Sequence, residues 1–266
     1  MEQDLLYIDM PQYHVEYTED DYSYNRKGKE NLKKALYESS KGYCMYCYRR
    51  IMVDGEEYGQ LEHAIEFSIF PSKLKNCVPN IGISCAACNN KYKKVGQKKR
   101  IPEQKDLKIF DKDSCCGESF CKEPCDAYKR LKKAYLKKEE SRFIMQPLGV
   151  NSRDCGLPYH RQLLLQYDVL NGKYIPSRKE VYSAQEKKII QHHIDLFGLN
   201  SDKRRSDQMI RFLEDTIERN GNYSKMEYNN QVVELFVDFI LKGKTADEVV
   251  KICEHLYTYA YIRFST

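Results

Sequence analysis

The sequence contains two similar cysteine-rich segments, GYCMYC at residues 42–47 and PNIGISCAACNN at residues 79–90. Each segment has one Cys-x-x-Cys pair, and the four cysteines are Cys44, Cys47, Cys85 and Cys88. Such a pair supplies two sulfurs from one tight turn, and two pairs complete the tetrahedral set that zinc prefers. The spacing therefore predicts one structural zinc that closes a long loop between the pairs.

The loop between the pairs carries polar residues of the kind that hydrolytic sites use. Glu62 and His63 are adjacent, and Asn80 lies just before the second pair. Asn89 and Asn90 directly follow it. An imidazole with a pKa near neutrality is suited to take a proton from water. A carboxylate and an amide oxygen are hard ligands that suit Mg²⁺ or Mn²⁺.

The order and spacing of these residues resemble those of HNH endonucleases of the ββα-metal type. The resemblance rests on GYCMYC, on Leu61-Glu62-His63 and on the run from Pro79 to Asn89. It implies that His63 is the general base, that Asn80 braces the loop, and that Glu62 and Asn89 bind a catalytic Mg²⁺ or Mn²⁺. The acid is Glu where Asp is commoner, and Asn90 leaves the second ligand ambiguous by one position.

The resemblance implies an α+β fold: a zinc-stapled ββα-metal core, followed by a β-hairpin and a C-terminal helical region. A metal-dependent endonuclease acting on DNA is the expected function. One alternative is a catalytically idle zinc module that binds nucleic acid or protein, in which His63 is a structural histidine. Another is an effector that cleaves RNA with the same site. The complete set of polar residues favours an enzyme, because a binding module has no need of it.

A basic segment follows the second cysteine pair. We expect a helix over CNNKYKKVGQKK, residues 88–99, because Asn is favoured near a helix start. Its cations can neutralise backbone phosphates without selecting a base sequence, and a solvated basic face is the alternative. The predicted nucleic-acid-binding residues are Lys91, Lys93, Lys94, Lys98, Lys99 and Arg100.

A second group of cysteines lies at residues 115–125 and consists of Cys115, Cys116, Cys121 and Cys125. The group could hold another zinc, although adjacent cysteines rarely both bind one ion. Free thiols in an insertion are the alternative. The isolated Cys77, Cys155 and Cys253 are most simply buried small residues.

Composition indicates a soluble intracellular protein. A length of 266 residues predicts one large or two modest domains. Mean hydropathy is −0.71, and no apolar run reaches the roughly 18 residues of a membrane helix. No secretory signal is visible, so the eleven cysteines suggest a reducing cytoplasm in which thiols bind metal. With a net charge of only +5, any nucleic-acid surface must be local.

Three regions are expected along the chain. Residues 1–26 form an arm rich in acids and tyrosines, which either docks a protein partner or packs on its own domain. Residues 27–142 form the nuclease domain with a cysteine-rich insertion, and residues 143–266 form the hairpin and helical domain. Expected helices span 27–40, 127–140, 183–197, 202–220, 228–242 and 245–263. Expected strands lie at 51–53, 60–61, 142–146, 163–169 and 173–176.

The downstream sequence resembles one subgroup of HNH proteins. LLLQYDVLNGKYIP at residues 163–176, then LFGLN at 196–200 and the basic pair Arg204-Arg205, are similar to the HNH subunits of Septu and related retron defence systems. In those systems the nuclease works beside an ABC-type ATPase. The resemblance implies a role in antiphage defence and a separate ATPase partner. The chain has no Gly-x4-Gly-Lys-Ser/Thr loop, so a nucleotide switch would lie on another chain.

Overall fold

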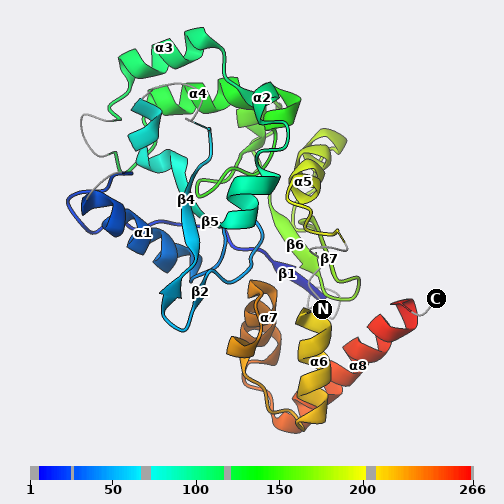
Figure 1. The fold of residues 1–266 in the computed structure, drawn as a ribbon. Coiled ribbons are helices and arrows are strands. Elements are labelled where there is room, and N and C mark those ends of the chain that lie inside the picture. The colour runs from blue at the N-terminus through cyan, green and yellow to red at the C-terminus, as the bar shows by residue number, and fades with distance from the viewer. Residues whose placement is uncertain (1–5, 25–26, 67–72, 117–120, 202–207, 265–266) are drawn as a thin grey trace.

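The structure is a computed structural model that describes residues 6–24, 27–66, 73–116, 121–201 and 208–264 (Figure 1). It is an α+β protein with small antiparallel sheets, which confirms the predicted α+β class. Within the described residues, no helix combines the length and the apolar content needed to cross a membrane.

A two-stranded antiparallel sheet lies at the centre of the molecule (Figure 1). It pairs β4 (Gly59–His63) with β5 (Ile81–Cys85), so that Glu62 lies opposite Gly82 and His63 opposite Ile81. Helix α1 (Lys27–Ser40) has the bounds that the sequence predicts and packs against β5. The long loop between β4 and β5 therefore begins and ends beside one short sheet.

A small hairpin precedes the central sheet and pairs β2 (Met52–Val53) with β3 (Glu56–Glu57). Its turn is Asp54-Gly55, and both residues have positive φ, 52° and 82°. Two successive positive φ angles are typical of the tight hairpin turn that matches the twist of paired strands. The predicted strand at 51–53 and its turn are confirmed.

The helices after β5 differ from the single helix predicted over 88–99. A helical turn at Cys88–Tyr92 is followed by a break and then by α2 (Gln97–Arg100). The break ends at Gly96, whose φ of 71° is left-handed and interrupts the helix.

Two further helices, α3 (Gln104–Asp113) and α4 (Asp126–Leu136), pack against each other at one end of the central sheet (Figure 1). Helix α4 was predicted, with an end four residues later. Helix α3 was not predicted, although its buried face of Leu107 and Phe110 has helical spacing.

A second sheet joins the N-terminal arm to the middle of the chain, in the order β1-β6-β7. Strand β1 (Tyr7–Asp9) pairs with β6 (Leu165–Asp168), which pairs with β7 (Lys173–Pro176) across the predicted Asn171-Gly172 turn. Along residues 6–24 the apolar side chains turn inward, and most of the acids are exposed. Of the two interpretations of the arm, the structure shows the one in which it packs on its own protein. Residues 1–5 and 25–26 lie outside the described residues.

The strand predicted at 142–146 is not formed. Residues 143–146 are buried, but their backbone pairs with no strand. The Ile144 N–H instead donates to Nδ1 of His193 at 3.2 Å, and the Phe143 N–H donates to the Ser141 carbonyl. The apolar run is explained by burial against α5 and not by sheet pairing.

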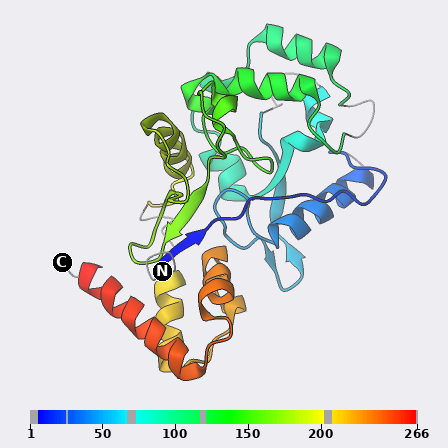
Figure 2. The same cartoon turned by 180° about the vertical axis from the view of Figure 1, so that it is seen from behind.

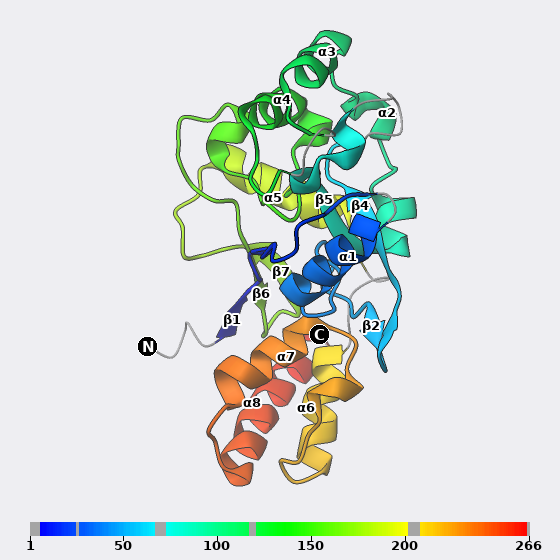
Figure 3. The same ribbon diagram turned by 90° about the vertical axis from the view of Figure 1, so that its left-hand side faces the viewer.

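The C-terminal region is helical, as predicted (Figures 2 and 3). Helix α5 (Ala184–Leu196) begins at a capping box of Ser183 and Glu186. Helices α6 (Gln208–Glu218), α7 (Gln231–Phe236, extended by one wide turn to Leu241) and α8 (Ala246–Phe264) lie below the β1-β6-β7 sheet in Figure 3. The predicted helix start at 202–207, with Arg204 and Arg205, falls outside the described residues. The capping box predicted at Thr245 and Glu248 is present.

Candidate metal centre and active site

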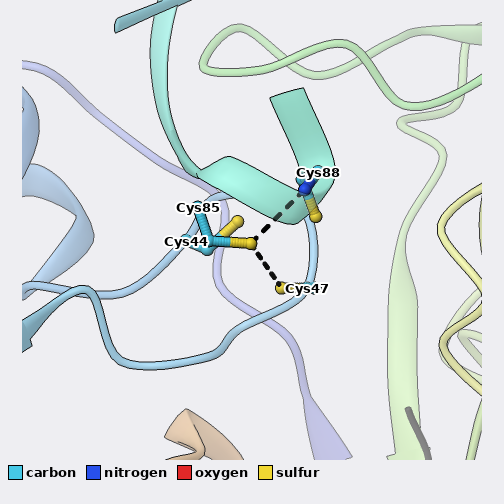
Figure 4. Close-up of side chains that lie close together, drawn as sticks. All are labelled: Cys44, Cys47, Cys85 and Cys88. Carbon is cyan, nitrogen blue, oxygen red and sulfur yellow. Dashed lines mark hydrogen bonds between the residues drawn. The ribbon is translucent and has the colours of Figure 1, made fainter. Parts of the chain in front are cut away.

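The four cysteines of the two pairs meet at one point (Figure 4). Their sulfur atoms all lie within 4.8 Å of one another, and the Sγ atoms of Cys47 and Cys85 are 3.7 Å apart. A tetrahedral zinc with bonds of about 2.3 Å separates its sulfurs by about 3.8 Å. The geometry and the soft donors therefore fit one metal ion such as zinc.

Local backbone geometry brings the two pairs together. The Cys44 N–H donates to the Arg49 carbonyl at 2.8 Å, and this closes the first turn. The Met45 N–H donates to the Ile83 carbonyl at 3.1 Å and fixes that turn on β5. Cys85 ends β5 and Cys88 begins the next helical turn, so the second pair spans a strand-to-helix junction.

Burial and mutual hydrogen bonds shift the pKa values of these thiols in different directions. Burial raises the pKa of the Cys44 and Cys88 thiols, because an apolar environment disfavours thiolate. Hydrogen bonds from the Cys44, Cys47 and Cys88 sulfurs lower the pKa of Cys85. A bound dication would stabilise all four thiolates together, since metal binding displaces their protons.

The side chain of Glu62, on β4, is buried, and each of its two carboxylate oxygens has a partner. Its Oε2 accepts a hydrogen bond from the Tyr46 hydroxyl at 2.6 Å, and its Oε1 is ion-paired with the Lys93 ammonium. Lys93 also donates to the His63 carbonyl, and burial holds its pKa well below the usual range. The prediction that Lys93 contacts phosphate is corrected, because its side chain lies inside the protein beside the predicted metal ligand.

His63 ends β4, and its ring is nearly buried, with 7% of the residue exposed. Its Nε2 lies 2.9 Å from the Lys75 carbonyl, which can only accept, so Nε2 carries the hydrogen. In the neutral ring the lone pair is then on Nδ1. Burial lowers the pKa of His63 to about 4. The ring is therefore unprotonated at neutral pH, as a general base must be.

Asn80 ties the end of the loop to its beginning. Its Oδ1 accepts from the Ile65 N–H at 2.8 Å, and its Nδ2 donates to the Ile65 carbonyl at 3.0 Å. The Tyr128 hydroxyl of α4 also donates to Oδ1 at 3.2 Å. These bonds hold the backbone two residues after His63 in one position.

One cavity of about 360 Å³ brings several predicted site residues together. Its lining includes Glu62, His63, Asn89 and Lys93. The side-chain amides of Asn89 and Asn90 both donate to Gln60 Oε1, at 3.1 and 2.9 Å, but only Asn89 lines the cavity. This favours Asn89 over Asn90 as the second ligand.

The predicted basic surface is smaller than the sequence suggests. Arg100 is buried, and its guanidinium pairs with Glu66 at 2.8 Å. Glu66 in turn accepts from the Tyr135 hydroxyl at 2.7 Å. Like Lys93, Arg100 is internal and is removed from the predicted phosphate-contacting set. The exposed members are Lys91, Lys94, Lys98 and Lys99.

In the second cysteine group, the Sγ atoms of Cys115, Cys116 and Cys125 lie within 4.8 Å of one another, so these three could hold a metal ion. Cys115 and Cys121 are joined by a disulfide. Cys77, which the sequence suggests is isolated, has its sulfur 2.8 Å from that of Cys116. Cys155 and Cys253 are buried, as predicted.

No protein-family model, no curated protein and no solved structure matches this chain.

Proposed function

We propose that this chain is a metal-dependent endonuclease of the HNH type that hydrolyses phosphodiester bonds of DNA. The observation that best supports the proposal is one cavity lined by Glu62, His63 and Asn89. Asn89 directly follows Cys88, one of the four cysteines that could hold a metal, and His63 ends the strand before the loop that Asn80 closes. A zinc-binding module alone would not explain why a neutral histidine and a buried carboxylate share a cavity.

The residues of the chain have distinct parts in the proposed reaction. His63 Nδ1 takes the proton of the attacking water, while the Lys75 carbonyl fixes the ring through Nε2. Tyr46 orients the Glu62 carboxylate, and Asn80 holds the loop behind His63. A Mg²⁺ or Mn²⁺ ion at Glu62 and Asn89 would supply positive charge opposite the phosphate and acidify the water. Lys94, on the cavity lining, and the neighbouring exposed lysines would contact the nucleic-acid backbone.

Lys93 has a particular consequence for the catalytic cation, because its ammonium occupies the side of Glu62 that such a cation would need. We expect Lys93→Met to destabilise the cation-free protein by roughly 3–5 kcal/mol, since it leaves a buried carboxylate unpaired. Mn²⁺ should then raise the melting temperature of the variant far more than that of the wild type. The measurement is a thermal melt with and without Mn²⁺. Metal ions are removed from the buffer with a chelating resin before the protein is added, so that the protein keeps its zinc.

Lys94→Met is the matched control, because Lys94 is the exposed neighbour. It should melt like the wild type under both conditions. Adding Glu62→Gln to Lys93→Met should abolish the response to Mn²⁺. A response that survives in the double variant would place the cation elsewhere.

We further propose, from the resemblance to Septu and retron subunits, that the nuclease is a defence effector controlled by a separate ATPase. A groove of about 860 Å³ supports a docking role, and it is lined by the N-terminal arm and by the C-terminal helical region. Residues Tyr7 to Gln12 of the arm form one side, and Leu235, Phe239 and Ile240 of the helical region form the other. Phe239 is 70% exposed there, which is unusual for a large apolar side chain.

A cleavage assay tests the proposed function directly. Zinc-loaded protein is incubated with supercoiled plasmid or with structured RNA, in Mg²⁺ or Mn²⁺. The assay is run with the chain alone and with the product of the neighbouring gene plus ATP. We expect nicked or linear plasmid in at least one of these arms, and no products from Glu62→Gln.

Three outcomes would change the proposal. Cleavage of RNA alone would support the RNA effector. Binding of nucleic acid without cleavage in every arm would support the idle zinc module. Activity that ignores both the neighbouring protein and the nucleotide would exclude the ATPase partner.

A further inference from the structure

Five cysteine sulfurs gather at a second place, at the far end of the loop that begins after His63. The Cys116 sulfur is 2.8 Å from that of Cys77, and Cys115, Cys116 and Cys125 lie within 4.8 Å of one another. Cys121 joins the group through its bond to Cys115. Among the described residues, Cys115, Cys116 and Cys125 here and the four cysteines of the first cluster are the only sets of three or more His, Cys, Asp or Glu whose ligand atoms all lie within 4.8 Å of one another.

Burial and spacing select four of the five sulfurs. Cys77 and Cys116 are almost completely buried and Cys125 is partly buried, whereas Cys115 is exposed. Adjacent cysteines rarely both bind one ion. Cys116 is the buried member of the adjacent pair, so we take Cys116 as a ligand and leave Cys115 out of the site. Cys121 and Cys125 are separated by three residues, which is within the spacing of zinc-binding pairs. We propose that Cys77, Cys116, Cys121 and Cys125 form a second tetrahedral zinc site.

Formation of this site requires the Cys115–Cys121 disulfide to be reduced. Two thiols of a reductant such as glutathione, or one dithiol, supply two electrons and two protons. The products are the Cys115 and Cys121 thiols and the disulfide of the reductant. Zinc then displaces four protons from the four selected thiols. Cys115 keeps its own proton and remains outside the metal site.

The second zinc would connect the loop between β4 and β5 to helix α4. Cys77 is two residues from Lys75, whose carbonyl fixes the ring of His63, and directly precedes the short helix Val78–Asn80. Cys125 is the N-cap residue of α4, from which Tyr128 reaches Asn80. One ion would thus hold the supports of His63 and Asn80 together. The zinc site itself does not depend on the proposed nuclease activity.

Zinc stoichiometry tests the proposal. The full chain is purified with a thiol reductant and zinc, and zinc per chain is measured by mass spectrometry against amino-acid analysis. We expect two zinc ions in the wild type and one in Cys121→Ser. Cys115→Ser should retain two, because Cys115 is not a ligand. Cys253→Ser, which replaces a buried cysteine of α8, should also retain two.

A single zinc in the reduced wild type, with Cys115 and Cys121 shown to be free thiols by alkylation, would overturn the proposal. Two zinc ions in folded Cys121→Ser would overturn it as well. Cys121 is only partly buried, whereas Cys77 is fully buried, so the Cys121→Ser variant should fold where Cys77→Ser is too disruptive. Anomalous diffraction at the zinc edge gives an independent readout, with a second peak among these four sulfurs expected.

Discussion

Replacing Cys88 with serine should release the first zinc and unfold the loop that carries Glu62, His63 and Asn80. Cys88 is buried among the other three sulfurs, and a serine hydroxyl cannot replace a thiolate ligand. Structural zinc contributes roughly 10–16 kcal/mol in small zinc-binding folds, which equals or exceeds the whole stability of a typical domain. The sheet of β4 and β5 has only two strands and is marginal without the metal. Zinc content, thermal melting and hydrogen exchange of residues 59–85 measure the effect.

Cys253→Ser is the matched control for this prediction. Cys253 is fully buried in α8 but lies in neither cysteine cluster. The control should keep its zinc and lose only about 1–3 kcal/mol, the cost of placing a hydroxyl in an apolar site. Folded, zinc-free wild-type protein, or a Cys88→Ser variant that melts like the control, would exclude a structural role for the metal.

Features encoded by local sequence were predictable. The Asn171-Gly172 turn, the capping box at Thr245 and the bounds of α1 each depend on a few neighbouring residues, whose preferences act before tertiary contacts form. The meeting of the two Cys-x-x-Cys pairs was predictable for a different reason. A metal that needs four soft ligands brings distant pairs together whatever the path of the intervening chain.

The unpredicted features of the site come from contacts between distant residues. Lys93 and Glu62 are 31 residues apart, and Cys77 and Cys116 are 39 residues apart. Within the basic run, Lys93 and Lys94 are adjacent lysines, and only the fold decides that one is buried and the other exposed. Nor does a lone cysteine such as Cys77 show from its own neighbours that it joins a cluster. The strand predicted at 142–146 fails for the same reason, because burial without a partner strand has the same apolar pattern.

His63→Gln should reduce cleavage by about 10² to 10⁴-fold, the usual contribution of general base catalysis. The glutamine amide can still donate to the Lys75 carbonyl, as Nε2 of His63 does, but it has no basic nitrogen to take the proton of water. The melting temperature should stay close to that of the wild type, because the loss lies in proton transfer. Single-turnover cleavage at saturating Mn²⁺, together with thermal melts, separates the two effects.

His193→Gln provides the comparison, because His193 is also a buried histidine whose pKa burial lowers, to about 3, but it does not line the cavity. That variant should lose stability, since His193 accepts the Ile144 N–H, and keep its turnover per folded molecule. His63→Ala adds a second test, rescue of cleavage by imidazole, which is not expected if His63 has only a structural role. Free imidazole should restore part of its cleavage by entering the vacated space and taking the proton. Near wild-type turnover in His63→Gln, or rescue of His193→Ala in place of His63→Ala, would assign the base to another residue.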